Sequence, residues 1–148
     1  MGSSSWDQGI SFFLANMTWL QPPGHVHVMV KESWAEKTLA FSHAGALPGN
    51  LTFTAQQGGK GLVVRAVNKG QAPLSFTVRM EAGAPLSAAG AAEAAISTLS
   101  GPDLKGDNSP SHLDAIAPKS SKVALGAGGK SLSLTLPGYS FTVAQIPS

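Results

Sequence analysis

The sequence contains no cysteine in its 148 residues, which excludes a disulfide framework, a thiolate metal site and a cysteine nucleophile. Charged residues make up only 12% of the chain and the net charge is +2, without any basic run that would attract nucleic acid. No stretch approaches the roughly 18 apolar residues of a membrane span. Residues 1–5 also lack the basic start and apolar core of a signal peptide. We therefore expect neither nucleic acid nor a membrane as a partner.

The chain is organised around the stretch from Trp6 to Trp34, which combines an apolar run with an amphipathic segment. Residues 9–14 are almost continuously apolar, and this pattern favours a strand covered on both faces, as in a parallel sheet. Pro22-Pro23-Gly24 can open a helix, because a proline in the first turn loses only an amide that would be unpaired there. Apolar residues on one helical face follow at Val26, Met29, Val30 and Trp34. The stretch therefore predicts a strand, a loop and a helix, the repeating unit of an α/β barrel.

This single unit cannot complete a barrel within the chain. A full (β/α)8 barrel takes about 250 residues, whereas the chain has 148. We therefore expect residues 1–36 to be the terminal strand-loop-helix of a truncated barrel that belongs to a larger parent protein. Ligands in such folds lie at the loops that follow the strands, so residues 16–21 are the predicted ligand-contacting loop.

Residues 37–148 carry the pattern of an all-β domain. Short stretches alternate polar and apolar residues, and turns rich in glycine and proline separate them. The predicted strands cover residues 37–42, 51–55, 62–68, 74–80, 95–99, 122–125, 131–136 and 139–146. Their regular spacing predicts a mainly β fold, an antiparallel, jelly-roll-like β-sandwich preceded by the one strand-helix unit.

Both parts of the sequence are similar to one enzyme family. WDQGISFFLANMTWLQPPGHVHVM resembles the end of the catalytic barrel of family 51 glycoside hydrolases, the α-L-arabinofuranosidases, where the last strand leads into a Trp-x-Gln segment and a helix. LVVRAVNKG, TLSGPDLKGDNSPSHLDAIAP and LPGYSFTV resemble the carboxyl-terminal sandwich domain of the same enzymes. In the long loop Asn108, Ile116 and Pro118 match the family pattern, while His112-Leu113 replaces the more usual proline region.

The resemblance implies a parent enzyme that hydrolyses terminal non-reducing α-L-arabinofuranosyl residues of arabinose-containing polysaccharides, with retention of configuration. This places it in L-arabinose metabolism and cell-wall glycan breakdown. Such an enzyme needs two carboxyl groups about 5–5.5 Å apart. In the family the acid/base belongs to an Asn-Glu pair, and this sequence contains none. We therefore assign no catalytic residue and expect the chain alone to be inactive.

Two residues are candidate substrate contacts. Trp19-Leu20-Gln21 matches the family segment, which implies that Gln21 binds sugar hydroxyls and that Trp19 forms the pocket wall or supports it. An amide suits a hydroxyl because it both donates and accepts hydrogen bonds. The alternative is structural: Gln21 caps the helix or bonds the neighbouring turn, and Trp19 packs beside a strand end.

We predict no cofactor and no metal site. His25 and His27 are two residues apart and point to different sides of a helix, and the acidic residues of the long loop lack the spacing of a calcium site. Asn50, in Asn50-Leu51-Thr52, is a candidate glycosylation site. Asn16, in Asn16-Met17-Thr18, is less favoured because it lies in the expected ligand loop.

For the parent enzyme we favour an extracellular location, and we consider it a candidate homo-oligomer. The alternative function is a stand-alone β-sandwich that binds carbohydrate or acts as a structural accessory domain. A carbohydrate-binding sandwich would need an exposed aromatic platform, and most aromatic residues of this chain occupy positions typical of a core.

Overall fold

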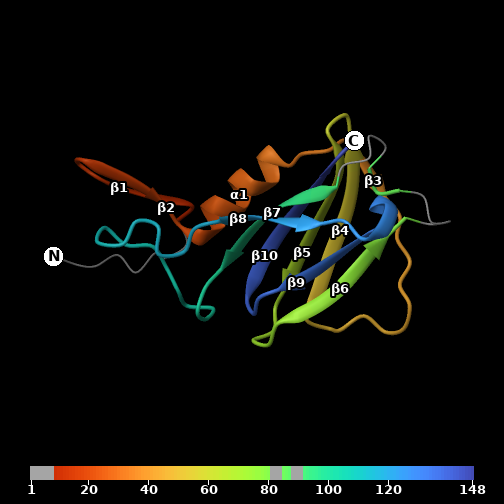
Figure 1. The fold of residues 1–148 in the computed structure, drawn as a ribbon. Coiled ribbons are helices and arrows are strands. Elements are labelled where there is room, and N and C mark those ends of the chain that lie inside the picture. The colour runs from red at the N-terminus through yellow and green to blue at the C-terminus, as the bar shows by residue number, and fades with distance from the viewer. Residues whose placement is uncertain (1–8, 81–84, 88–91) are drawn as a thin grey trace.

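A computed structural model describes residues 9–80, 85–87 and 92–148, so Trp6 lies outside the described part (Figure 1). The described chain is built of antiparallel strands and one α-helix, with one short 3-10 helix. In chain order the elements are β1 (Ser11–Leu14), β2 (Met17–Leu20), α1 (Pro22–Glu32), β3 (Lys37–Leu39), β4 (Leu51–Gly58), β5 (Gly61–Asn68), β6 (Leu74–Arg79), β7 (Glu93–Ser100), β8 (Lys119–Ala124), η2 (Ala127–Gly129), β9 (Ser131–Leu136) and β10 (Ser140–Pro147). No helix in the described ranges is long and apolar enough to cross a bilayer.

Two antiparallel sheets form the body of the molecule. The larger has six strands in the order β3-β4-β5-β10-β7-β8, and the smaller pairs β6 with β9. Strand β6 alternates half-buried with exposed residues along its length, as the sequence pattern predicts. The residues buried between the sheets are Leu62, Val64, Leu86, Ala94, Ile96, Leu132, Leu134, Ala144 and Ile146. The predicted mainly β, antiparallel fold is confirmed.

Helix α1 covers part of the other face of the six-stranded sheet. Met29 from the helix is 4% exposed and packs with Val63, Leu99 and Val143 from β5, β7 and β10. These strand residues alternate with those of the inter-sheet core, so the central strands are buried on both sides. The molecule therefore has three layers, helix, large sheet and small sheet (Figure 1). The division of the chain between residues 36 and 37 stays a prediction.

The expected buried strand and ligand loop at the amino end are wrong in their local structure. Strand β1 pairs with β2 as an antiparallel hairpin in which Phe12 lies opposite Trp19, so most of the expected loop is a second strand. The turn falls at Ala15 and Asn16, which break the apolar run and allow the chain to reverse. The hairpin extends away from the sheets (Figure 1), and Phe13 is 79% exposed.

Trp34 does not belong to the apolar face of α1, as its spacing had predicted. The helix ends at Glu32, and Ser33 at its carboxyl cap turns the Oγ back to the carbonyl of Met29 at 2.7 Å. The chain leaves the helical path at this cap, so Trp34 is 65% exposed. The predicted face therefore keeps Met29 as its buried member.

Candidate functional site

Gln21, the predicted sugar contact, stands at the junction of the hairpin and the helix. It is the N-cap residue of α1, with extended backbone and no side-chain cap bond, and Pro22 follows at the first helical position. Its backbone N–H donates to the carbonyl of Ile10 at 3.0 Å, which ties the hairpin to the start of the helix. The residue is 7% exposed. Its side chain is therefore free of the helix end but enclosed by protein.

The amide of Gln21 pairs with the backbone of Asn108, which lies 87 residues further along the chain. Gln21 Nε2 donates to the Asn108 carbonyl at 2.6 Å, and the Asn108 N–H donates to Gln21 Oε1 at 3.0 Å. This two-bond arrangement satisfies one donor and one acceptor of Gln21. Sugar binding by Gln21 stays a prediction, and within this chain its amide serves a structural contact. The contact is with the long loop, however, whereas the sequence had suggested the helix end or the neighbouring turn.

Asn108 extends the contact in the other direction. Its Nδ2 donates to the carbonyls of Leu20 at 2.8 Å and Ile116 at 2.9 Å, and its Oδ1 accepts the N–H of Ile116 at 2.7 Å. Asn108 is 2% exposed. Buried polar groups of this kind are costly unless paired, and here the pairing joins three segments. We name Gln21, Asn108 and Ile116 the amide cluster.

Trp19 supports the amide cluster from the hairpin. Its indole Nε1 donates to the same Asn108 carbonyl at 3.1 Å, and its ring stacks on Phe12 with 6.0 Å between centroids. Aromatic rings of this kind bury a large apolar surface while the N–H takes one fixed partner. Within this chain Trp19 therefore makes a structural contact, and its role at a sugar pocket stays a prediction.

Arg65 fixes the opposite end of α1. It lies on β5 and is 9% exposed. Its Nε donates to Ser33 Oγ at 3.1 Å, its Nη2 donates to the Ser33 carbonyl, and its Nη1 donates to Gln56 Oε1. Burial lowers the pKa of Arg65, yet a guanidinium stays charged in proteins. A cation at the carboxyl end of a helix complements the helix dipole, so Arg65 anchors α1 on the sheet.

The remaining predicted positions are spread over the surface. Asn50 precedes β4 and its Nδ2 donates to Asn68 Oδ1 at 3.2 Å, whereas Asn16 is exposed at the hairpin turn. Glycosylation at Asn50 stays a prediction. Within the described ranges no group of three or more His, Asp or Glu residues could hold a metal ion. Every described carboxylate is exposed: Glu32, Glu36, Glu93, Asp103, Asp107 and Asp114.

Solved structures share this arrangement. The arabinose-bound MgGH51 α-L-arabinofuranosidase matches with a TM-score of 0.80 and 17% identity, over 98% of this chain and 22% of its own. The arabinose complex of the Thermotoga maritima α-L-arabinofuranosidase matches with a TM-score of 0.76 and 18% identity, over 95% of this chain and 32% of its own. This chain has the fold of the carboxyl-terminal region of family 51 α-L-arabinofuranosidases.

A third enzyme of this family, from Xanthomonas axonopodis pv. citri, matches with a TM-score of 0.72 and 17% identity, over 93% of this chain and 28% of its own. The chain therefore spans between about a fifth and a third of the length of these family 51 enzymes. No family model and no curated protein matches the sequence. The resemblance noted from sequence motifs is confirmed at the level of the fold.

The structure also brings out residues that sequence reasoning missed. Asn108 was noticed as part of a family pattern and of the polar loop, but its central place in the amide cluster depends on Gln21 and Leu20, which lie 87 and 88 residues away. Arg65 had a usable signal, because a charged residue interrupts the apolar run of β5. A cation in a strand buried on both faces indicates a specific partner.

Proposed function

We propose that this chain is the carboxyl-terminal part of an α-L-arabinofuranosidase that hydrolyses terminal non-reducing α-L-arabinofuranosyl residues of arabinose-containing polysaccharides. The fold shared with family 51 enzymes over almost the whole chain carries this proposal. In this proposal the chain contributes no catalytic carboxylate. The rest of the enzyme supplies both the acid/base and the nucleophile.

The exposure of the acidic residues supports the proposal that the catalytic carboxylates lie outside this chain. A general acid in a glycosidase is held in an environment that raises its pKa. Each carboxylate in the described ranges is exposed to solvent, and none belongs to the buried polar residues. The chain on its own is therefore expected not to hydrolyse glycosides.

The hairpin of β1 and β2 supports a contact with further protein. Ile10 is 49% exposed, Leu14 50% and Phe13 79%, and the three lie close together in the sequence. Apolar patches of this kind mark surfaces that bind other protein. In the proposed enzyme the catalytic barrel covers them.

The amide cluster then acts as the joint between the barrel end and the sandwich. It bonds the residues before α1 to the loop between β7 and β8 through Asn108. In the proposed enzyme it holds Trp19 and Gln21 in fixed positions at the barrel's edge. An arabinose-containing glycan would meet the enzyme through that barrel.

The size of the native protein and its activity test the proposal together. An antibody against this chain should detect a native protein of about three to five times 15.1 kDa, because the matched enzymes are longer by that ratio. The precipitated protein should hydrolyse an aryl α-L-arabinofuranoside, and the recombinant chain should not. A native product of 15 kDa alone, or activity in the recombinant chain, would refute the proposal.

A second candidate function, a stand-alone carbohydrate-binding sandwich, is favoured by one observation, the exposed ring of Trp34. A carbohydrate site at Trp34 could exist in this chain whether the chain stands alone or is part of a longer enzyme.

A further inference from the structure

A groove runs along the carboxyl-terminal half of α1, over the part of the large sheet that the helix leaves uncovered. It consists of two adjoining hollows of about 460 and 190 Å³. Glu32, Ala95 and Gln145 line both hollows, so the two lie next to each other. The larger volume falls within the 300–1,000 Å³ typical of small-molecule sites. We name this feature the helix-side groove.

The floor of the larger hollow is made of small polar residues with unused hydrogen-bonding groups. Ser97 on β7 lies opposite Ser120 on β8, and both line the hollow with Gln145. None of these three side chains makes a hydrogen bond to another described residue. The floor therefore offers both donors and acceptors to a ligand.

The hydroxyls on the small sheet behave differently. Ser75 and Thr135 bond each other at 2.9 Å, and Thr77 and Ser133 do so at 3.0 Å. Cross-strand hydroxyl pairs of this type satisfy one another on the surface of a sheet. The unpaired hydroxyls in the helix-side groove are therefore not a general consequence of serine-rich strands in this protein.

Trp34 provides an aromatic wall at the smaller hollow. The residue lines this hollow together with Lys60 and Pro147, and it is 65% exposed. Its indole N–H has no hydrogen-bond partner among the described residues. An aromatic ring next to mixed donors and acceptors suits a sugar, whose ring has an apolar face and a rim of hydroxyls.

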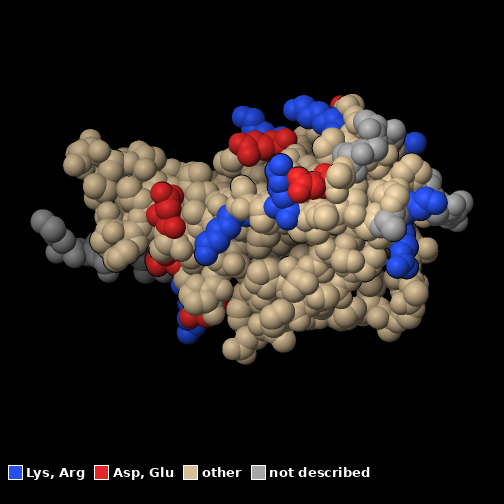
Figure 2. Space-filling model, in the orientation of Figure 1, with Lys and Arg blue, Asp and Glu red and all other residues tan. Residues whose placement is uncertain are grey.

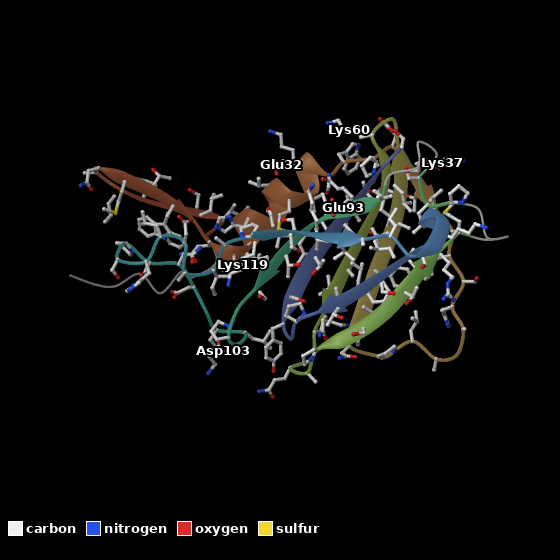
Figure 3. The ribbon with its side chains drawn as sticks, in the orientation of Figure 1. Glu32, Lys37, Lys60, Glu93, Asp103 and Lys119 are labelled. Carbon is white, nitrogen blue, oxygen red and sulfur yellow. The ribbon has the colours of Figure 1, made fainter. Side chains whose placement is uncertain are left out.

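The charges around the groove balance. Lys122 pairs with Glu93 at 3.2 Å, while Glu32 and Lys60 line the groove itself. Figure 3 labels Glu32, Lys60 and Glu93 in the upper middle of the view, and Figure 2 shows residues of both signs interspersed there. A rim of mixed sign gives no preference for an anionic or a cationic ligand.

We propose that the helix-side groove binds a neutral polysaccharide chain, with one sugar ring stacked on Trp34 and its neighbours bonded to the hydroxyls of Ser97 and Ser120. This site lies between α1 with the residues that follow it and the large sheet, and it involves neither Gln21 nor Trp19. It would hold a polymer near the enzyme without taking part in cleavage. The choice of an arabinose-containing glycan as the first probe rests on the proposed function.

The experiment titrates arabinoxylan oligosaccharides into the purified chain and measures heat and tryptophan fluorescence. We expect saturable binding with a change in emission. The Trp34→Ala variant should bind about tenfold more weakly or worse, as for a central aromatic anchor. Ser97→Leu, which fills the floor while leaving Trp34 in place, should also lose binding. Circular dichroism and thermal melting check that both variants fold.

Phe13→Ala is the matched control, because Phe13 is an exposed aromatic residue on the hairpin, outside the groove. It should bind as the unaltered chain does. Absence of binding to any neutral polysaccharide, or equal binding by Trp34→Ala, would overturn the inference while leaving the proposed enzyme intact. Binding only to a polysaccharide without arabinose would uphold the groove and count against the proposed substrate.

Discussion

Replacing Asn108 by alanine tests whether the amide cluster holds the long loop to the rest of the protein. The Asn108 side chain makes three hydrogen bonds to backbone groups, one to the carbonyl of Leu20 and two to Ile116, at 2.7–2.9 Å. Alanine removes all three and leaves the backbone groups unpaired in a site where Asn108 is 2% exposed. The loop between β7 and β8 should then detach from the hairpin more readily.

The magnitude follows from the number and burial of the lost bonds. A net loss of about 1 kcal/mol for each bond gives a decrease of about 3 kcal/mol in the free energy of unfolding. Gln21→Ala removes only the two bonds to the Asn108 backbone, and should cost about 2 kcal/mol. Because both variants loosen the same contact, the double variant should cost less than their sum by more than about 0.5 kcal/mol.

Denaturant unfolding of the purified variants measures these differences, and hydrogen exchange locates them. The amide proton of Ile116, which donates to Asn108 Oδ1, should exchange about 100-fold faster in Asn108→Ala. Asn16→Ala, at the exposed hairpin turn, should stay within about 0.5 kcal/mol of the unaltered chain. A loss below about 0.5 kcal/mol for Asn108→Ala, or additive single variants, would refute the cluster as a cooperative joint.

The charge variant Asn108→Asp adds a pH signature to the same test. At neutral pH the introduced carboxylate faces two carbonyls, so it should be at least as destabilising as alanine. Burial beside these carbonyls raises the pKa of that carboxyl above its unfolded value of about 3.9. The destabilisation caused by this substitution is therefore greatest above the raised pKa and decreases as the pH falls through that pKa. A stability difference that does not shrink toward acid pH would contradict the placement of Asn108.

Arg65→Met should lower the free energy of unfolding by about 3 kcal/mol, because it leaves the hydroxyl and carbonyl of Ser33 at the end of α1 without their donor. Thermal melting measures this loss, and an unchanged midpoint would rule out Arg65 as the residue that anchors α1. Gly61→Ala should cost at least about 2 kcal/mol, because φ is +116° and a Cβ would meet the backbone of β10. Gly59→Ala, with open space around it, should remain neutral in the same unfolding assay. Phe13→Ser should reduce self-association of the isolated chain without lowering its melting temperature, because Phe13 is 79% exposed. Light scattering measures the self-association, and an unchanged signal would contradict a role of the hairpin in it.

Much of the β-sandwich could be predicted from the sequence, because the signal for a strand is local. In β6 and β9 polar and apolar residues alternate with period two, and only a strand with one buried face uses that pattern. Glycine turns mark the strand ends in the same way. These features require no knowledge of which strand pairs with which.

The amino-terminal unit shows where local patterns were insufficient. The apolar run of residues 9–14 suits a buried parallel strand and an exposed hairpin equally, because both accept aromatic and branched residues. The structure gives a hairpin. Periodicity likewise placed Trp34 on the helix face, but the cap at Ser33 ends the helix first.

The sequence by itself determined the strand pattern of the sandwich, the proline-opened helix and the family likeness, since each depends on residues close together in the chain. Only the tertiary structure decided the partners of Gln21 and Arg65 and the exposure of Trp34. Gln21 and Asn108 are 87 residues apart, and Arg65 and Ser33 are 32 apart. Hydrogen bonds between buried polar groups form wherever the fold brings a donor to an acceptor, and no local pattern records that distance.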